Sequence, residues 1–131
     1  MNAVVPPPIS EAARLEMISG HGTKDDAGKT RFSLVPVEAL TAIAGVFTYG
    51  AKKYSEDNWR NGMSWRRMLD PLKRHIAAWE GGEDLDPESG YHHLAHAGCC
   101  LMMLLTYCLL PNFYREHDDR WKRPAKRVRR K

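Results

Sequence analysis

The 131-residue chain has few cysteines, no membrane-length apolar run and no segment that alternates strictly between apolar and polar residues. Its longest apolar run, residues 97–110, is shorter than the ~20 residues that span a bilayer, so we expect a buried helix and no membrane contact. The three cysteines, Cys99, Cys100 and Cys108, all lie inside this run, where free thiols behave as small hydrophobes. An odd number of such cysteines predicts a reducing, cytoplasmic location.

Charge is distributed unevenly along the chain. The formal net charge is +4, yet the segment from Arg120 to Lys131, RWKRPAKRVRRK, carries eight Lys or Arg and no acid, which leaves −4 for the rest. We therefore expect a mildly acidic domain followed by a basic C-terminal tail, residues 116–131. Such a tail is either a solvated extension or a contact for nucleic acid or another polyanion, and the sequence leaves both interpretations open.

Helical periodicity and helix-boundary residues predict three or four main helices. Residues 1–24 are expected to form a proline-rich arm and a short helix, EAARLEMISG, which Ser10 caps and Gly20 ends. Apolar residues at helical spacing from Leu40 to Phe47 predict a helix after Pro36, VEALTAIAGVFTYGAKKY. The remaining predicted helices are WRRMLDPLKRHIAAWE, capped by Ser64 and kinked or started late by Pro71, and a long helix from about His92 to Leu110.

The predicted fold is an all-α helical bundle, with its folded domain over residues 25–115. The last of its helices is apolar nearly all round, and a domain this small cannot cover such a helix alone. We therefore expect oligomerisation, as a dimer or a tetramer, to complete the bundle.

Imidazoles and carboxylates gather around the loop before the last long helix. His93 and His96 are three residues apart and share a helix face, whereas His92 is the expected bystander. If the last two long helices pack antiparallel, the end of the first, with His75 and Glu80, meets the start of the second. The loop between them adds four acids, Glu83, Asp84, Asp86 and Glu88.

This group of side chains predicts a metal site. A single histidine on a helix is usually a core or surface residue, but a cluster of histidines beside several acids favours a metal ion. Imidazole together with carboxylate favours Mn²⁺ or Co²⁺, and Mg²⁺ can serve where bound phosphates complete its ligand shell. The candidate ligands from this cluster are His75, Glu83, His93 and His96.

A second cluster is basic and aromatic. Lys and Arg side chains bind phosphates, Trp59 can stack on a base, and Asn58 can bind the edge of that base. The alternative is that Lys52 and Lys53 complement the C-terminal end of a helix dipole and that Trp59 is a packing residue. The candidate substrate-binding residues are Lys29, Arg31, Lys52, Lys53, Asn58, Trp59 and, beside them, Arg60.

Four fragments in register carry a family resemblance: GKTRFSLVPVEAL, YGAKKYSEDNWRNGMSW, RHIAAWEGGEDLDPESG and HLAHAGCC. Over about residues 25–105 the chain resembles the phage and bacterial dATP/dGTP diphosphohydrolases, relatives of the MazG-like all-α NTP pyrophosphohydrolases. The resemblance implies metal-dependent hydrolysis of dGTP and/or dATP to the monophosphate and pyrophosphate, by an oligomeric bundle in the host-cell cytoplasm if a phage encodes it. One branch, the MazZ type, implies precursor supply for 2-aminoadenine DNA.

The chain departs from the MazG-like motifs, which place several glutamates on one helix and Glu-x-x-Asp on the next. His93-Leu94-Ala95-His96 stands in place of the second motif, and around the first only His75 is ligand-capable. The missing carboxylates would come from Glu80, Glu83 or Asp84, or from Glu38. The alternative for Glu38 is an acid favoured by the helix dipole.

The implied reaction assigns further roles to these residues. A metal-bound water attacks the α-phosphorus in line, and Glu83 or Glu80 acts as general base. The leaving pyrophosphate is stabilised by cations, for which the candidates are Lys29, Arg31, Lys52 and Arg74.

Two alternatives remain open. An HD-type dNTP triphosphohydrolase needs a histidine, an adjacent His-Asp pair and a later aspartate, an order that His75, His117-Asp118 and Asp119 supply. A non-enzymatic nucleic-acid-binding protein would instead use the basic tail. Release of triphosphate rather than pyrophosphate distinguishes the first alternative, and strongly salt-dependent DNA binding distinguishes the second.

Overall fold

The computed structural model describes residues 3–19 and 22–126 and, of residues 16–19, the backbone only. The chain divides into two compact units, Met1–Leu34 and Val35–Lys131, and each is considered by itself. The helix end expected at Gly20 and the last residues of the basic tail, 127–131, lie outside the described residues. The domain limits expected after residues 24 and 115 stay predictions.

The described part of the first unit contains α1, Glu11–Ser19, and the short 3-10 helix η1, Phe32–Leu34. The amide of Ala13 donates to Oγ of Ser10 over 3.2 Å, which confirms that Ser10 caps α1. Most described side chains of this unit are exposed, so it has little core of its own.

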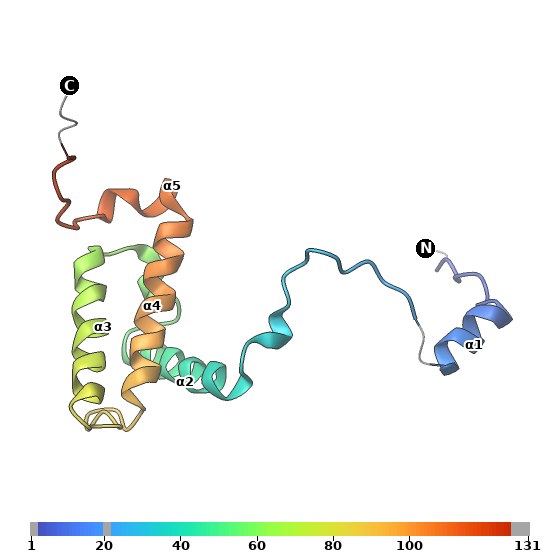
Figure 1. Cartoon of the computed structure of the whole chain (residues 1–131), viewed down its shortest axis with the longest axis horizontal. Coiled ribbons are helices and arrows are strands. Elements are labelled where there is room, and N and C mark those ends of the chain that lie inside the picture. Colours follow the sequence, from blue (N-terminus) through green and yellow to red (C-terminus); the bar gives the residue numbers. More distant parts are fainter. Residues whose placement is uncertain (1–2, 20–21, 127–131) are drawn as a thin grey trace. The chain divides into compact units, whose positions relative to one another are not determined.

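The second unit is built from helices, as predicted. It contains α2, Val37–Lys53, then α3, Trp65–Glu80, α4, His93–Leu109, and α5, Pro111–Tyr114, with short 3-10 helices η2, Asn58–Asn61, and η3, Arg115–His117. Within the described residues there is no strand, and the one isolated bridge joins Leu85 to His92. Figure 1 shows α3 and α4 side by side and antiparallel, with α2 near the loop that joins them. The all-α prediction is therefore confirmed.

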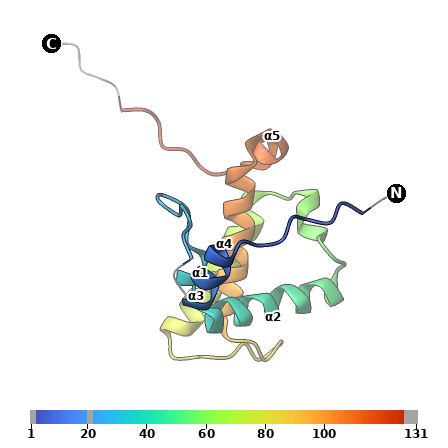
Figure 2. The same ribbon diagram turned by 90° about the vertical axis from the view of Figure 1, so that its right-hand side faces the viewer.

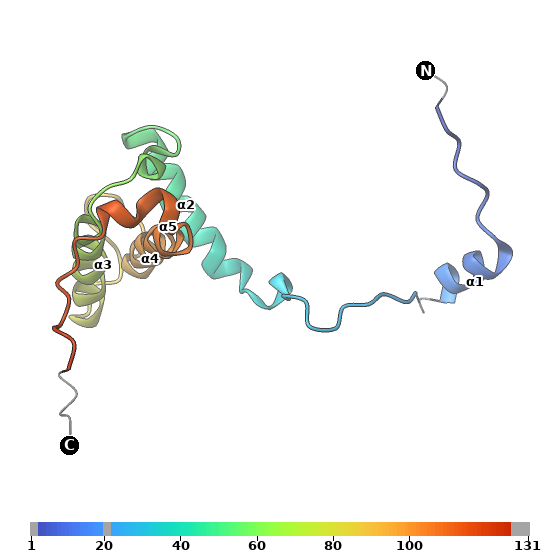
Figure 3. The ribbon, with the colours of Figure 1, turned by 90° about the horizontal axis from the view of Figure 1, so that it is seen from above.

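The start of α3 is capped by a distant residue rather than by its own first side chain. Ser64 occupies the N-cap position but makes no capping hydrogen bond. Instead, its hydroxyl donates to the carboxylate of Asp119, and that carboxylate accepts the amide of Arg66 over 3.0 Å. The predicted N-cap position of Ser64 is confirmed, but the acceptor for the helix amide comes from a residue that follows α5. In Figure 3 the chain after α5 runs back toward the start of α3.

Gly98, which has no side chain, lies where α2 crosses α4. Val46, Ala95 and Cys99 form a buried cluster where these helices meet, and Figure 2 shows α2 crossing α4 near its start. A Cβ atom at Gly98 would lie 2.7 Å from Cδ1 of Ile43, so a larger residue at this position would force the Ile43 side chain to shift. Burial raises the pKa of the Cys99 thiol to about 12, which keeps this cysteine protonated and apolar.

The other end of α4 anchors η2. Trp65, Tyr107 and Tyr114 form a second buried cluster. The hydroxyl of Tyr107 donates to the carbonyl of Trp59 over 2.5 Å, and that of Tyr114 donates to the carbonyl of Arg60 over 2.8 Å. These two bonds tie the segment between α2 and α3 to the C-terminal helices.

One face of α4 remains exposed and apolar within the chain. Its exposed apolar side chains are Leu94, Leu101, Met102, Leu105 and Leu109, between 40% and 68% accessible. Among the described residues no single helix is long and apolar enough to cross a membrane, although His93–Leu109 and Pro111–His117, bent by 98°, meet that requirement together.

Replacing Tyr107 by Phe tests the anchoring of η2. Tyr107 is fully buried, so loss of its hydroxyl leaves the Trp59 carbonyl without this partner and is expected to lower the free energy of unfolding by about 1–3 kcal/mol. Tyr54→Phe is the control, because Tyr54 is 68% exposed and its loss of a hydroxyl should change little. Urea denaturation of both variants measures the difference, and equal stabilities would contradict the anchoring role.

Candidate active site

Three histidines converge where the end of α3 meets the start of α4. Nδ1 of His75 lies 2.8 Å from Nδ1 of His93, and these two rings are centred 5.1 Å apart. The ring of His75 also stacks on that of His96, with centroids 4.4 Å apart and planes inclined by 7°. The antiparallel packing of the two helices therefore brings together the three imidazoles predicted from the sequence.

Backbone hydrogen bonds close the loop that carries the acids. The amide of Asp86 donates to the carbonyl of Tyr91 over 2.8 Å, and the amide of Gly90 donates to the carbonyl of Asp86 over 2.7 Å. Gly90 has a φ of 76°, a conformation that glycine adopts without strain. The amide of His93 donates to the carbonyl of Asp84 over 2.8 Å, so the loop continues directly into the first turn of α4.

His92 is the N-cap of α4. Its Nδ1 accepts the amide of Leu94 over 3.0 Å, which satisfies one of the free donors at a helix start. This role turns His92 away from the three clustered histidines and agrees with its interpretation as a bystander.

Glu83 orients His93. Nε2 of His93 lies 2.6 Å from Oε1 of Glu83, and the His93 side chain is only 5% exposed whereas that of Glu83 is 54% exposed. Because a carboxylate only accepts hydrogen bonds, Nε2 carries the proton of this contact. Nδ1 of His93 is then the nitrogen that faces His75.

Two residues outside the predicted site set, Ser89 and Asp86, complete the cluster. Oγ of Ser89 lies 2.6 Å from Nε2 of His96 and donates to Oδ2 of Asp86 over 2.7 Å. The amide of Ser89 donates to the same oxygen over 3.1 Å. The sequence predicts Asp86 near the histidines, in the acidic loop, but gives no reason to assign it a role in the site. The signal for both is the turn sequence Asp-Pro-Glu-Ser-Gly, in which the side chain of the first residue binds the amide of the fourth.

Burial sets the protonation of the cluster. It lowers the pKa of His75, with a further contribution from neighbouring His96. Burial likewise lowers the pKa of His96, although the charge of Asp86 opposes this effect. Both imidazoles are therefore neutral at pH 7. Burial alone would raise the pKa of Asp86, but the hydrogen bonds from Ser89 outweigh it and the pKa lies below its usual value, so this carboxylate is ionised.

Aromatic rings from α2 and from the loop flank His96. Tyr49 of α2 and Tyr91 of the loop both meet the His96 ring edge-on, with centroids 6.4 Å and 6.2 Å away. The two tyrosine rings are 5.7 Å apart. This arrangement gives the cluster an aromatic wall on the side of α2.

Lys53 is the predicted phosphate-binding cation that the structure places beside the loop. Its Nζ lies 3.1 Å from Oε1 of Glu88, and its charge acts on the pKa of His96. The neighbouring Lys52 is exposed in the last turn of α2, and Arg74 is exposed directly before His75. Lys53 therefore lies at the loop, whereas Lys52 and Arg74 are the sequence neighbours of Lys53 and His75.

Several predicted residues do not join the cluster. Glu80 is the exposed last residue of α3, and Asp84 contributes its backbone carbonyl to the amide of His93. Glu38 lies in the first turn of α2, so the 15 residues between it and Lys53 place it roughly 22 Å along the helix from that end.

Trp59 is a packing residue, the alternative left open by the sequence. Its ring lies 6.1 Å from that of Phe47 and 5.9 Å from that of Tyr107, as centroid distances. The guanidinium of Arg60 lies over the ring at 4.5 Å. Asn58, the predicted partner in base recognition, is exposed at the start of the same short helix.

The spacing of the imidazole nitrogens in the cluster bears on whether they can bind one metal ion. Two imidazole nitrogens on one tetrahedral ion, each bonded at about 2.1 Å, lie roughly 3.4 Å apart, whereas those of His75 and His93 are 2.8 Å apart. Across residues 3–19 and 22–126, no three His, Cys, Asp or Glu side chains stand as ligands of one ion. The donor types are those that bind transition metals, but the spacing between His75 and His93 is shorter than two ligands of one ion require.

The arrangement required by an HD-type phosphohydrolase is not formed. Asp119 binds the start of α3, at Ser64 and Arg66. His75 lies eleven residues after Ser64, which is roughly 16 Å along a helix. His117-Asp118 directly precedes Asp119, so this His-Asp pair and His75 belong to opposite ends of α3.

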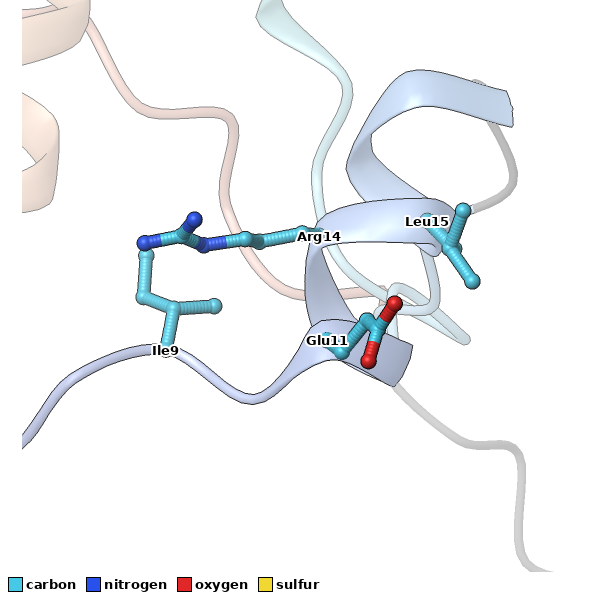
Figure 4. Close-up of a pocket in the computed structure, with 4 residues that line it drawn as sticks. All are labelled: Ile9, Glu11, Arg14 and Leu15. Carbon is cyan, nitrogen blue, oxygen red and sulfur yellow. The ribbon is translucent and has the colours of Figure 1, made fainter.

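Two surface depressions belong to the first unit. One is lined by Ile9, Glu11, Arg14 and Leu15, and Figure 4 shows the Arg14 side chain extending toward Ile9 while Leu15 projects away. The other is lined by Asp26 and residues 29–33, which include Lys29 and Arg31. Because the two units are considered separately, phosphate binding by these two cations stays a prediction.

Comparison with known proteins identifies the family. The family model described as dATP/dGTP diphosphohydrolase, N-terminal, matches residues 19–120. The dATP/dGTP diphosphohydrolase of Salmonella phage PMBT28 is 38% identical over 108 residues, which are 82% of this chain and 36% of the relative. The chain thus spans about a third of that relative's length, and no solved structure matches it. Because the family model covers most of the sequence, the chain belongs to the dATP/dGTP diphosphohydrolase N-terminal family.

Proposed function

We propose that the histidine cluster is the catalytic site of a diphosphohydrolase that converts dGTP and/or dATP to the monophosphate and pyrophosphate. The observation that carries the proposal is the convergence of His75, His93 and His96, with contacts of 2.8 Å between imidazoles and 2.6 Å to Glu83. The name of the relative from Salmonella phage PMBT28 supports the choice of substrate. If a phage encodes the chain, the reaction takes place in the host cytoplasm and can supply a precursor of 2-aminoadenine DNA.

The proposed cofactor is a divalent metal ion, Mn²⁺ or Mg²⁺, with Co²⁺ as a further possibility. His75, His93 and His96 would hold it, and Glu83 and Asp86 are the nearest carboxylates. When bound, the metal supplies charge neutralisation at the phosphates and a water of lowered pKa. The neutral state of His75 and His96 at pH 7 supports this role, because an imidazole needs a free lone pair to bind a metal.

The chain's own residues supply the remaining parts of the reaction. Lys53, Lys52 and Arg74 would bind the phosphate oxygens and stabilise the leaving pyrophosphate. Phosphate binding by Lys29 and Arg31 is proposed from their residue type alone. Glu83 is the preferred general base over Glu80, because it contacts His93 and its side chain is half exposed to water.

Replacing His96 by Ala tests the site. The change removes an imidazole from the cluster and is expected to lower turnover of dGTP and dATP by at least about 100-fold, with far-UV circular dichroism unchanged. His92→Asn is the matched control, because asparagine also caps helices and His92 lies outside the cluster. Products with Mn²⁺ and with Mg²⁺ are resolved by chromatography. Full activity of the His96 variant removes it from the site, and triphosphate release favours the HD-type reaction.

The exposed face of α4 supports assembly with a second copy of the chain. Leu94 and Leu101 are seven residues apart, Leu101 and Leu105 four, and Met102 and Leu109 seven, a spacing that lines one side of a helix. A continuous stripe of this kind is self-complementary about a two-fold axis. We therefore propose that α4 packs against its counterpart in a dimer, which a tetramer would contain twice.

Replacing Leu105 by Glu tests this interface. A charge in the middle of the stripe must be desolvated without a partner, so the variant is expected to be monomeric under conditions where the unmodified chain is a dimer or tetramer. Leu85→Glu, in the exposed loop, is the control. Light scattering after size-exclusion chromatography gives the mass of each. A monomeric unmodified chain, or a variant with unchanged mass, contradicts the proposal.

Contact between the basic tail and nucleic acid is a second, accessory proposal. Two cations of the tail are already paired within the chain: Arg120 donates to Asp118 over 2.8 Å, and Lys122 lies 3.3 Å from the same side chain. Any contact with nucleic acid would therefore depend mainly on the other basic residues of the tail. A chain truncated after Arg120 should keep its dNTP hydrolysis and lose salt-dependent DNA binding, as measured by fluorescence anisotropy at several salt concentrations. Equal DNA affinity of the two chains would remove the tail from this role.

A further inference from the structure

The hydroxyl of Ser89 lies between a carboxylate and an imidazole. Oγ is 2.7 Å from Oδ2 of Asp86 and 2.6 Å from Nε2 of His96. The direct separation between that carboxylate oxygen and Nε2 is 3.5 Å, longer than a good hydrogen bond. The serine hydroxyl therefore carries the contact between Asp86 and His96.

The proton of each bond follows from the donors available. A hydroxyl has one proton to donate, and an ionised carboxylate can only accept. Ser89 therefore donates to Asp86, and its lone pair accepts the proton of Nε2–H of His96. In a neutral imidazole with Nε2 protonated, Nδ1 is the nitrogen with the free lone pair.

The same logic applies one turn earlier on α4. Glu83 accepts from Nε2 of His93 over 2.6 Å, so Nδ1 of His93 faces the cluster, 2.8 Å from Nδ1 of His75. Both α4 histidines are thus held from the loop by their Nε2 atoms. One is held by a carboxylate directly, and the other is held by a carboxylate through a serine.

We propose that Asp86 and Ser89 are positioning residues that fix His96 as its Nε2–H tautomer and direct Nδ1 into the site. This inference rests on the proposed function for its catalytic meaning, but the tautomer is a property of the chain alone. Hydrogen bonds to the second ring nitrogen commonly orient histidines that act as ligands. The side chains involved are nearly buried, with 12% exposure for His96 and 17% for Asp86, so water competes little for these bonds.

The other hydrogen bonds of Ser89 support a fixed rather than an exchanging arrangement. The amide of Ser89 also donates to Asp86 over 3.1 Å, and the Ser89 hydroxyl accepts the amide of Tyr91 over 3.3 Å. The hydroxyl oxygen thus meets one acceptor and two donors. This leaves it no free position for a second orientation, so reversal of the Ser89–His96 bond requires breaking the turn.

The tautomer can be measured directly on the full-length, metal-free chain. Long-range ¹H–¹⁵N correlation spectra at pH 7.5 distinguish protonated from unprotonated ring nitrogens for each histidine. The unmodified chain is expected to show His96 with Nε2 protonated and Nδ1 free. A spectrum with Nδ1 protonated overturns the inference, whether or not the chain hydrolyses dNTPs.

Variants separate positioning from folding. Asp86→Asn replaces an obligate acceptor by a group that can also donate, so Ser89 is free to donate to His96 and the spectrum should shift toward the Nδ1–H form. Ser89→Ala should give a mixture of the two forms, and Ser89→Thr, which keeps the hydroxyl, should restore the Nε2–H form. If Asp86→Asn fails to fold, comparison of the Ser89→Ala and Ser89→Thr spectra tests the inference. Identical spectra for Ala and Thr contradict the role of the hydroxyl.

Hydrolysis adds a second readout for the same variants. With Mn²⁺ present, Ser89→Ala is expected to lose about 10–100-fold in kcat, and Ser89→Thr should recover most of it. If the unmodified chain hydrolyses no dNTP while the expected tautomer is observed, the proposed function fails and the positioning inference stands. If hydrolysis is normal in Ser89→Ala, the positioning pair has no part in the reaction and the inference is overturned.

Discussion

The carboxylate of Asp86 is the group on which both the loop and the site depend. It accepts the amide and the hydroxyl of Ser89, while the backbone of the same residue pairs with Tyr91 and Gly90. These bonds close the connection between α3 and α4 and set where α4 begins. Because His93 follows directly and is bonded to the carbonyl of Asp84, the first turn of α4 is oriented by the loop. The position of the imidazoles is thus a consequence of how the turn is closed.

The core of the second unit is small and divided along α4. One buried cluster, around Val46 and Cys99, lies where α2 crosses near the histidines, and the other, around Trp65 and Tyr107, lies toward the far end. The same helix still exposes an apolar stripe. A helix that serves two small clusters and retains free apolar surface gains stability from a further packing partner, so the proposed assembly would also stabilise the helix that carries His93 and His96.

Much of the fold could be predicted from local sequence. The bounds of α3 follow from its periodicity and from the glycines after Glu80, and the antiparallel pairing of α3 and α4 follows from their short connection. The capping of α3 could not be predicted in this way. Serine is a preferred residue type at the N-cap, but the hydroxyl of Ser64 binds Asp119, 55 residues later. Local propensity gives no information about an acceptor that tertiary structure brings to a helix start.

In the candidate site, too, some residues could be predicted from local sequence and others depend on tertiary structure. The three histidines could be found from residue type and spacing, because imidazoles that share a helix face are rare enough to notice. Ser89 could not be found from residue type, because a serine is neither a usual metal ligand nor a base, and its signal is the turn sequence Asp-Pro-Glu-Ser-Gly. Its position between Asp86 and His96 depends on the closed turn. For Trp59 the sequence leaves two interpretations open, since an aromatic residue beside cations fits base stacking and core packing equally. The contacts of its ring support packing.

The charges around the loop suit a polyanionic substrate. Lys53 is paired with Glu88, but the two side chains are 44% and 71% exposed, and exposed ion pairs of this kind contribute little to stability. A triphosphate that approaches Lys53 therefore replaces a weak partner with a stronger one at small cost. Inside the cluster, His75 and His96 are neutral at pH 7 because burial lowers the pKa of each. The site thus offers lone pairs in its interior and an exchangeable cation at its edge, a division of charge that agrees with the proposed binding of a metal–nucleotide complex.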